Sequence, residues 1–241
     1  MDGCQDVFAR YEKKYLISTE QQERLLKVLQ EKFRPDIYGI HTVCNIYFDT
    51  EDYRLIRTSL DKPVYKEKLR LRSYGTPGIN DLVFLELKKK YKGIVYKRRV
   101  PLPFSEARQF LHSGGLPEKP DQILHEIDWF VHHYSPVPKA YIAYDREAWL
   151  EKDDPELRVT FDRDIRGRES MLDLSRGSWG MPLLPPGTVL MEWKLPGVMP
   201  LGLSGLLSRN DILPVSFSKY GSFYQNHLAQ IPNVKGELLN A

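Results

Sequence analysis

The sequence predicts an α+β fold: an eight-stranded antiparallel β-barrel that forms a tunnel with a polar, basic lumen, flanked by helices. Cations alternate with apolar residues at a period of two, the period of a β-strand, in several segments. A glutamate also precedes a lysine by two positions three times, at Glu12/Lys14, Glu86/Lys88 and Glu192/Lys194. Amphipathic stretches of helical period lie between these segments and would cover the outside of a barrel.

The predicted strands place most of their charged residues on one face. They are Val64–Tyr74, Val83–Lys89, Ile94–Val100, Arg158–Asp162 and Val189–Lys194. The shared face carries Lys66, Lys68, Arg70, Arg72, Glu86, Lys88, Lys97, Arg99, Arg158, Asp162, Glu192 and Lys194, and Arg10, Glu12 and Lys14 share a face near the N-terminus. A solvated polar face would explain any one strand. Like charges along one strand repel each other, so the combination favours a charged lumen.

Five helices are predicted around these strands. Ser18 or Thr19 caps the first, which extends to about Phe33. The other four are Ser105–His112, Gln122–Tyr134, Leu201–Asn210 and Lys219–Gln230. Because no low-complexity linker divides the chain, we expect one domain over residues 1–241, with a core of about 10–227.

Composition sets further limits on function. Of the 241 residues, 41% are hydrophobic, which is enough for a large core, and the net charge of +3 does not indicate nucleic-acid binding. Neither Cys4 nor Cys44 has a zinc-like spacing, so both are expected to be reduced thiols. With no apolar leader and no run of about 18 apolar residues, we expect a soluble, cytoplasmic protein without a membrane segment in this chain.

Three other features of the sequence bear on its function. No G-x-x-x-x-G-K-[ST] is present, which argues against a P-loop nucleotide site. His125, Asp128 and His132 share a helix face that could hold a metal, although a solvated face is the commoner explanation. The run KKKYK at Lys88–Lys92 resembles a nucleic-acid patch, but only Lys88 faces the predicted lumen, and the others are interpreted as the solvated end of a hairpin. No nucleic-acid partner is expected.

Eight ordered segments resemble the catalytic domain of the vacuolar transporter chaperone (VTC) family. They are RYEKKYLIS, NIYFDTEDY, YKEKLRLRSYG, FLELKKKYKGIVYKRR, YDREAW, LRVTFDRDI, LMEWKLPG and FSKYGSFY, and they cover about Arg10 to His227. That family makes inorganic polyphosphate and belongs to the triphosphate tunnel metalloenzymes, the CYTH-like superfamily. The resemblance implies the eight-stranded barrel, open at both ends, with basic residues reaching inward.

The resemblance also implies a set of site residues. The inward basic positions of the family fall on Lys14, Arg70, Arg72, Lys88, Lys97, Arg99, Arg146, Arg158 and Lys219, and its metal-binding glutamate falls on Glu192. Arg146 and Lys219 rest on the resemblance alone. Strand alternation adds Lys68 and Lys194 as substrate ligands, with Glu12 and Glu86 as further candidate metal ligands. The residues predicted to act in catalysis are Lys14, Arg70, Arg72, Lys88, Lys97, Arg99, Glu192 and Lys219.

These residue types suit phosphoryl transfer. Arginine can hold two phosphate oxygens with its planar fork, and lysine supplies a compact charge. Carboxylate ligands favour Mn²⁺ or Mg²⁺ over zinc as the cofactor. The wider superfamily carries E-x-E-x-K on its first strand, where this chain has Arg10-x-Glu12-x-Lys14. The missing first carboxylate favours the polymerase branch over a two-metal hydrolase.

The sequence therefore predicts a metal-dependent phosphotransferase of the polyphosphate polymerase type. It would transfer the terminal phosphoryl group of ATP or another nucleoside triphosphate to a growing polyphosphate chain. The alternatives are a tripolyphosphatase or nucleoside triphosphatase, and a non-catalytic polyphosphate-binding module. The eukaryotic polymerase is fused to transmembrane helices that this sequence lacks, which leaves room for a membrane-bound partner protein.

Overall fold

A single curved antiparallel sheet organises the computed structural model, which describes residues 11–92, 94–117 and 120–229. Its strands are β1 (Tyr11–Ser18), β2 (Phe33–Pro35), β3 (His41–Asp49), β4 (Tyr65–Tyr74), β5 (Leu82–Tyr91), β6 (Ile94–Pro103), β7 (Val137–Glu151), β8 (Arg158–Arg168), β9 (Met181–Pro182), β10 (Thr188–Leu195) and β11 (Pro214–Val215). Neighbouring strands follow the order β11-β1-β10-β8-β7-β3-β4-β5-β6, while β2 pairs with β7 and β9 with β8.

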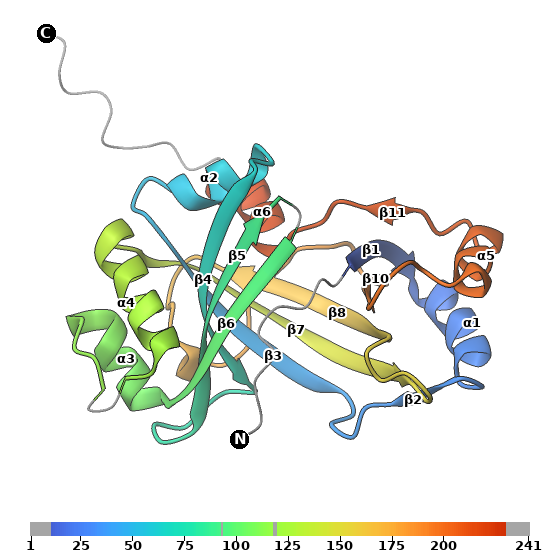
Figure 1. Ribbon diagram of the computed structural model, residues 1–241, viewed down its shortest axis with the longest axis horizontal. Coiled ribbons are helices and arrows are strands. Elements are labelled where there is room, and N and C mark those ends of the chain that lie inside the picture. The colour runs from blue at the N-terminus through green and yellow to red at the C-terminus, as the bar shows by residue number, and fades with distance from the viewer. Residues whose placement is uncertain (1–10, 93, 118–119, 230–241) are drawn as a thin grey trace, which may run out of the picture.

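Helices cover the outer face of this sheet at two places (Figure 1). The helices are α1 (Thr19–Leu29), α2 (Arg54–Leu60), α3 (Phe104–Ser113), α4 (Gln122–Tyr134), α5 (Leu201–Arg209) and α6 (Lys219–Phe223). Phe110 and Phe130, from α3 and α4, join Leu69, Leu85 and Leu87 of the sheet in one apolar core. A second core joins α1 to β1, β8 and β10, with Trp193 fully buried at its centre.

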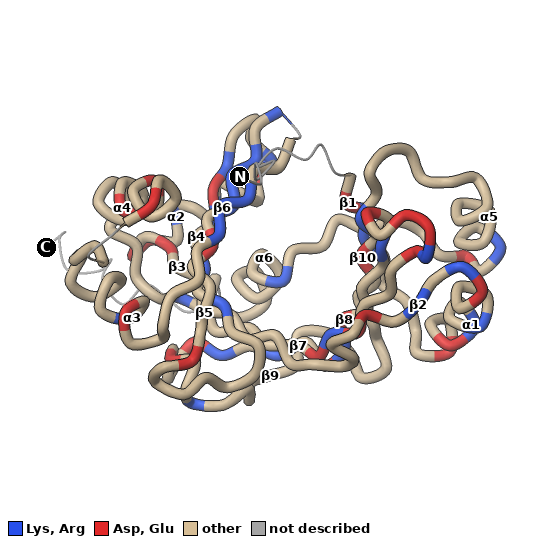
Figure 2. Tube along the Cα trace, turned by 60° about the horizontal axis from the view of Figure 1, so that its bottom comes forward, with Lys and Arg blue, Asp and Glu red and all other residues tan. Residues whose placement is uncertain are grey.

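The sheet is an open trough rather than a closed barrel (Figure 2). A closed barrel would need β6 to pair with β1, but within the described residues β6 ends the path, and β11 pairs with the free edge of β1 at Lys14 and Tyr15. The predicted antiparallel sheet with flanking helices is confirmed, whereas the closed eight-stranded barrel is not observed. We call the concave face the trough; it carries Lys14, Lys68, Arg70, Arg72, Lys88, Arg146, Asp162 and Glu192.

The predicted elements are largely present, with different ends. The side chain of Ser18 caps α1 and forms a capping box with Gln21, but α1 ends at Leu29 and not near Phe33. The reason is that Phe33 is buried in the second core and begins β2, which pairs with β7. The last helix ends at Phe223 and continues as a π-helical turn to Leu228. Arg10, Cys4 and Gln230 lie outside the described residues.

Alternation did not reveal β3 and β7, because β3 and the segment Ala140–Tyr144 of β7 are buried on both faces. In β3, Val43 through Asp49 are all buried. Asp49 ends this strand and accepts backbone N–H bonds from Leu55 and Ile56, which satisfies the start of the unpredicted helix α2. The hydroxyl of Tyr220 donates to the same carboxylate at 3.0 Å. One buried aspartate thus holds α2 and α6 at the same end of β3.

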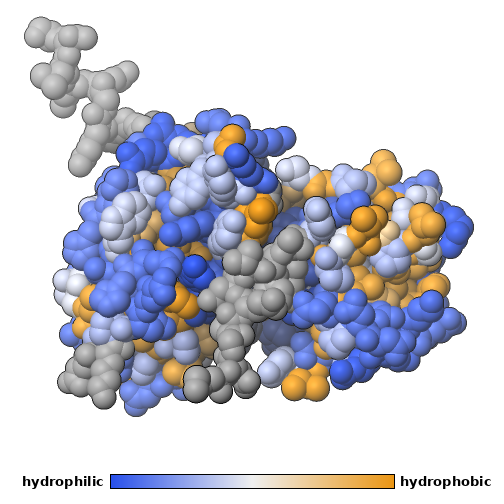
Figure 3. Space-filling model, in the orientation of Figure 1, coloured by the Kyte–Doolittle hydropathy of each residue, from blue (hydrophilic) through white to orange (hydrophobic). Residues whose placement is uncertain are grey.

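Exposed apolar side chains gather around α5 and β11. Val198, Leu201 and Leu213 are 94%, 90% and 74% exposed, and the space-filling view shows hydrophobic surface over these elements (Figure 3). Within the described part of the chain, no helix combines the length and apolar character needed to cross a membrane.

Candidate functional site

One wall of the trough carries a carboxylate surrounded by cations, which we call the Glu86 cluster (Arg70, Arg72, Glu86, Lys97 and Arg99). Strand pairing brings them together, because Arg70 on β4 and Arg99 on β6 both lie opposite Glu86 on β5. Nη2 of Arg70 lies 2.6 Å from the carboxylate, Nζ of Lys97 3.0 Å and Nε of Arg99 3.4 Å. Arg72 is more distant, at 4.0 Å.

The charge state of this wall follows from these contacts. Glu86 is only 1% exposed, and burial alone would raise the pKa of its carboxyl group. The neighbouring Arg70, Arg72 and Lys97 outweigh burial and hold that pKa well below its ordinary value. Burial of the Lys97 side chain lowers the pKa of its ammonium group to about 8. Glu86 is therefore ionised at neutral pH and balances part of the surrounding positive charge.

The opposite wall carries the Glu192 cluster (Lys14, Glu192 and Lys194). Lys14 on β1 lies opposite Glu192 on β10, and Lys194 is two residues further along the same face. Both lysine nitrogens lie 3.7 Å from the Glu192 carboxylate, too far for hydrogen bonds. Burial lowers the pKa of Lys194 to about 7 and also lowers that of Lys14. Glu192 itself stays ionised, since these lysines outweigh the effect of its burial on its pKa.

Asp162 anchors a third group of charges between the two walls. Its fully buried carboxylate accepts two hydrogen bonds from the guanidinium of Arg146, at 2.6 and 2.8 Å, and one from Lys219 at 2.5 Å. Burial opposes ionisation, but these two cations lower the pKa of Asp162 to about 2. The Lys219 ammonium also lies 4.2 Å from the ring centre of Tyr144, whose hydroxyl accepts from Arg72 at 3.2 Å.

The start of α6 connects these groups inside the trough (Figure 2). Nζ of Lys14 donates to the backbone carbonyl of Phe217, and Nζ of Lys68 donates to the hydroxyl of Ser218. Lys68 has no carboxylate partner among the described residues, and burial lowers its pKa to about 7. Lys88 on β5 pairs with Glu12 on β1 at 3.3 Å, across the opening between the two edges of the sheet.

The structure brings the predicted residues to one concave surface. Lys14, Lys68, Arg70, Arg72, Lys88, Lys97, Arg99, Arg146, Arg158, Lys194 and Lys219 lie on trough-facing positions with Glu12, Glu86 and Glu192. Sequence reasoning missed Tyr144, Ser218 and, as a site residue, Asp162. Strand period would have placed Tyr144 on the face of Arg146, two positions later. It does place Asp162 on the face of Arg158 but does not show that Arg146 and Lys219 contact it.

Neighbours of the trough residues point the other way. Lys89 and Arg98 lie on the outer face, where both pair with Glu126 on α4. Lys89 also lies 3.8 Å from the buried Glu67. The interpretation of Lys89 as part of a solvated hairpin end is therefore wrong, because α4 covers that position, whereas Lys90 and Lys92 are exposed. Lys90 shares the strand face of Lys88, so the expectation that Lys88 alone faces the lumen is also wrong.

A divalent cation would find one suitable carboxylate here. No hydrogen bond from the described residues reaches the Glu192 carboxylate, so its oxygens are available to a hard cation. Nowhere in residues 11–92, 94–117 and 120–229 do three metal-ligating side chains gather, the His125/Asp128/His132 face included. Mg²⁺ and Mn²⁺ commonly take their other ligands from water and substrate phosphates, and Glu192 fits such a site.

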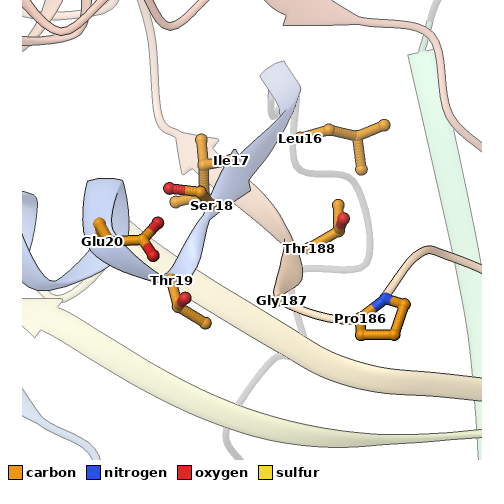
Figure 4. A pocket seen from close by; sticks show the side chains of 8 residues that line it. All are labelled: Leu16, Ile17, Ser18, Thr19, Glu20, Pro186, Gly187 and Thr188. Atoms are coloured by element: carbon orange, nitrogen blue, oxygen red, sulfur yellow. The ribbon is translucent and has the colours of Figure 1, made fainter.

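The pocket between β1 and α1 is less suited than the trough to bind a polyanion. The pocket in Figure 4, of about 420 Å³, lies where β1 meets α1 and is lined by residues 16–20 and 186–188. Its lining includes the carboxylate of Glu20 but no lysine or arginine. This chemistry does not suit a polyanion, and the trough remains the candidate site.

Comparisons with known proteins bear on the fold and on the family. No curated protein sequence matches the chain significantly. Among solved structures, a candidate adenylate cyclase from Bacillus halodurans superposes with a TM-score of 0.54 at 16% identity, covering 88% of this chain and 94% of its own. HpAC1 from Hippeastrum, a candidate adenylyl cyclase with a dominant triphosphatase activity, gives a TM-score of 0.53 at 17% identity, covering 89% and 94%. At these identities the similarity shows a shared fold.

The match to a sequence family is stronger evidence than the structural similarity. The profile of the VTC domain matches residues 9–226, which is most of the chain and includes every cluster described above. The chain therefore belongs to the VTC domain family.

Proposed function

We propose that this domain transfers the terminal phosphoryl group of a nucleoside triphosphate to a phosphate acceptor and so extends inorganic polyphosphate. The observation that carries the proposal is the trough, where cations from β1, β4–β8, β10 and α6 outnumber the carboxylates Glu12, Glu86, Asp162 and Glu192. A triphosphate bears about four negative charges, and its transfer depends on positioning and on stabilising charge. VTC family membership and the triphosphatase activity of HpAC1 support phosphoryl chemistry on this fold.

The clusters take different roles in this proposal. Arg70 and Arg72 hold phosphate oxygens on one wall, and Arg146 and Lys219 hold them at the floor. Glu192 would bind a Mn²⁺ or Mg²⁺ ion that arrives with the triphosphate, and that ion would neutralise charge on the phosphates. Glu86 balances the charge of its own wall and is assigned a structural role. Glu12 lies near Lys14 and Lys194 but already accepts a hydrogen bond from Lys88, so it is proposed as the weaker metal ligand.

The proposed reaction is an in-line displacement. An oxygen of the terminal phosphate of the acceptor attacks the γ-phosphorus, the bond from that phosphorus to the β,γ-bridging oxygen breaks, and the nucleoside diphosphate leaves with the bonding electrons. Charge develops on the leaving oxygen, where a guanidinium or ammonium group stabilises it. No protein nucleophile takes part in this step.

Product analysis tests the proposal. The chain is incubated with ATP and either Mn²⁺ or Mg²⁺, with and without a short polyphosphate primer. The expected products are long polyphosphate and ADP, with one ADP released for each phosphoryl group added to the chain. Orthophosphate as the main product would instead establish a triphosphatase, the candidate favoured by the activity of HpAC1. Binding without turnover would establish a capture module.

A further inference from the structure

The two ends of the trough differ in chemistry. At one end, where β4 and β6 finish and β3 and β5 begin, aromatic rings form a row, which we call the aromatic end (Tyr38, His41, Tyr74 and Phe84). At the other end, where β4 begins and β5 finishes, lysines gather, and we call this the lysine end (Lys62, Lys66, Lys88 and Lys90).

The rings of the aromatic end are in contact with one another. Tyr74 meets Phe84 and His41 edge-to-face, each with ring centres 5.6 Å apart, and Tyr38 continues the row beyond His41 at 6.3 Å. Tyr74 is 50% exposed and Tyr38 is 72% exposed. Half-exposed rings at the end of a charged trough offer faces on which a planar group can stack.

Arg99 connects this row to the Glu86 cluster. Its guanidinium lies 3.6 Å from the ring centre of Phe84 and 5.7 Å from that of Tyr74, and it donates to the Tyr74 hydroxyl at 3.1 Å. Arg72 precedes Tyr74 by two positions on the same face, a spacing of about 7 Å along a strand. The rings therefore lie within the reach of a nucleotide whose phosphates contact Arg72 and Arg70.

The lysine end favours phosphate alone. Lys66 on β4 lies opposite Lys90 on β5, and Lys68 lies opposite Lys88, so four ammonium groups are grouped by strand pairing. The nearby Lys90, Lys62 and Lys88 accordingly lower the pKa of Lys66, in addition to the effect of burial. Lys68, two positions deeper in the trough, is influenced in the same way by Lys66, Lys14 and Lys88. Cations thus follow one another from the middle of the trough to this end, where Glu12 is the carboxylate paired with Lys88.

We propose that a nucleoside triphosphate binds in one direction, with its base stacked at the aromatic end on Tyr74 and His41 and its phosphates pointing toward the lysine end, where the polyphosphate chain leaves. This inference rests on the proposed function and adds an orientation and a base-binding site to it. Stacking on aromatic rings and on arginine tolerates any base, because every base has a π-face. We therefore expect little selectivity among nucleotides.

A comparison of two ligands tests the aromatic end. Binding of the non-hydrolysable β,γ-imido analogue of ATP and of tripolyphosphate, which has no base, is measured by calorimetry. Tyr74→Leu should weaken the ATP analogue about 5- to 100-fold and leave tripolyphosphate within about twofold. Tyr74→Phe, which keeps the ring, should bind both ligands as the native chain does. Tyr91→Leu is the matched control, because Tyr91 is an exposed tyrosine at the far end of β5 on the outer face.

The lysine end gives the reciprocal test. The double variant Lys66→Ala/Lys90→Ala should weaken binding of long-chain polyphosphate at least about tenfold more than binding of the ATP analogue. If Tyr74→Leu loses both ligands equally, or neither, the orientation is overturned while the proposed function stands. If the native chain binds neither ligand, both proposals fall.

Discussion

Glu86 and Glu192 lie on opposite walls of the trough and are both buried and ionised, yet their partners differ. Arg70 and Lys97 contact Glu86 at hydrogen-bonding distance, whereas Lys14 and Lys194 stop 3.7 Å short of Glu192. A low carboxyl pKa is common to both and so does not mark a metal ligand. The difference lies in the hydrogen bonds: Arg70 donates to one oxygen of Glu86, whereas no described residue donates to Glu192. This difference supports our proposal that Glu86 balances charge and that Glu192 binds the metal.

The variant Glu86→Gln tests this comparison with the largest expected effect. Removing the charge leaves Arg70 and Lys97 facing each other without a counter-ion, and we expect a loss of about 3 kcal/mol in the free energy of unfolding. Chemical denaturation measures it. Added tripolyphosphate should restore most of the loss, because it supplies the missing negative charge. A variant as stable as the native chain would show that Glu86 does not balance this wall.

Glu192→Gln should affect activity in place of stability. We expect turnover with Mn²⁺ or Mg²⁺ to fall at least about 100-fold, since a metal that stabilises phosphoryl transfer contributes several kcal/mol. The melting temperature should fall less than in Glu86→Gln, because no hydrogen bond to Glu192 is lost, and tripolyphosphate binding without metal should persist. Glu12→Gln is the control, with a smaller expected loss. Native turnover in Glu192→Gln would remove this residue from the metal site.

Polyanions should stabilise the whole fold, because bound phosphates replace repulsion among the trough cations with attraction. A ligand that binds the folded state alone, at a hundredfold excess over its Kd, adds about 2.7 kcal/mol. Thermal melts with tripolyphosphate, orthophosphate and sulfate at matched ionic strength provide the measurement. Tripolyphosphate should give the largest shift, and high salt should reduce it. A shift no larger than that of sulfate would contradict convergence of the charges on one ligand.

The neighbours Arg98 and Arg99 test the two faces of β6. Arg99→Ala should weaken tripolyphosphate binding by about 1–3 kcal/mol, the usual range for a charge-assisted hydrogen bond. Arg98→Ala should leave binding unchanged, because Arg98 contacts Glu126 on the outer face. Lys97→Ala and Lys89→Ala form a second pair with the same expectation. Equal losses within a pair would show that the outer face also binds the anion.

The smallest expected effect is the uptake of protons by the trough lysines when a triphosphate binds. Burial lowers the pKa of Lys68 and Lys194 from 10.5 to about 7, so both are largely neutral at pH 8.5. Between pH 7 and pH 10.5 the unfolded chain therefore binds more protons than the folded one. The free energy of unfolding of the ligand-free protein should rise with pH across this range. A bound triphosphate favours the charged lysines, so binding at pH 8.5 should take up on the order of one proton.

Calorimetry in buffers of different ionisation enthalpy measures this uptake. Lys68→Arg keeps the positive charge but does not titrate, so it should reduce the uptake while binding persists. Uptake that is unchanged in Lys68→Arg and in Lys194→Arg would place the titrating group elsewhere.

The strand period predicts which face of the sheet a residue lies on, but it does not predict which side chains that residue contacts. Lys66 through Arg72 and Lys97 with Arg99 were assigned to the correct face, because in a strand the face follows directly from position. β3 and β7 escaped, because burial on both faces removes the alternation. Asp162 was assigned to a face but not to the site, because nothing local shows that Lys219, 57 positions later, contacts it.

The sequence by itself determined which cations share a face, the capping of α1 by Ser18 and the resemblance to the VTC family. Each depends on neighbours within a few positions or on motifs that the chain displays directly. Only the tertiary structure decided that the sheet stays open between β6 and β1, that α6 crosses the trough, and that Glu192 lacks the hydrogen bonds that Glu86 has. These depend on distances between segments far apart in the chain, because a carboxylate that accepts a hydrogen bond at 2.6 Å and one whose ion pairs stay at 3.7 Å look alike in the sequence.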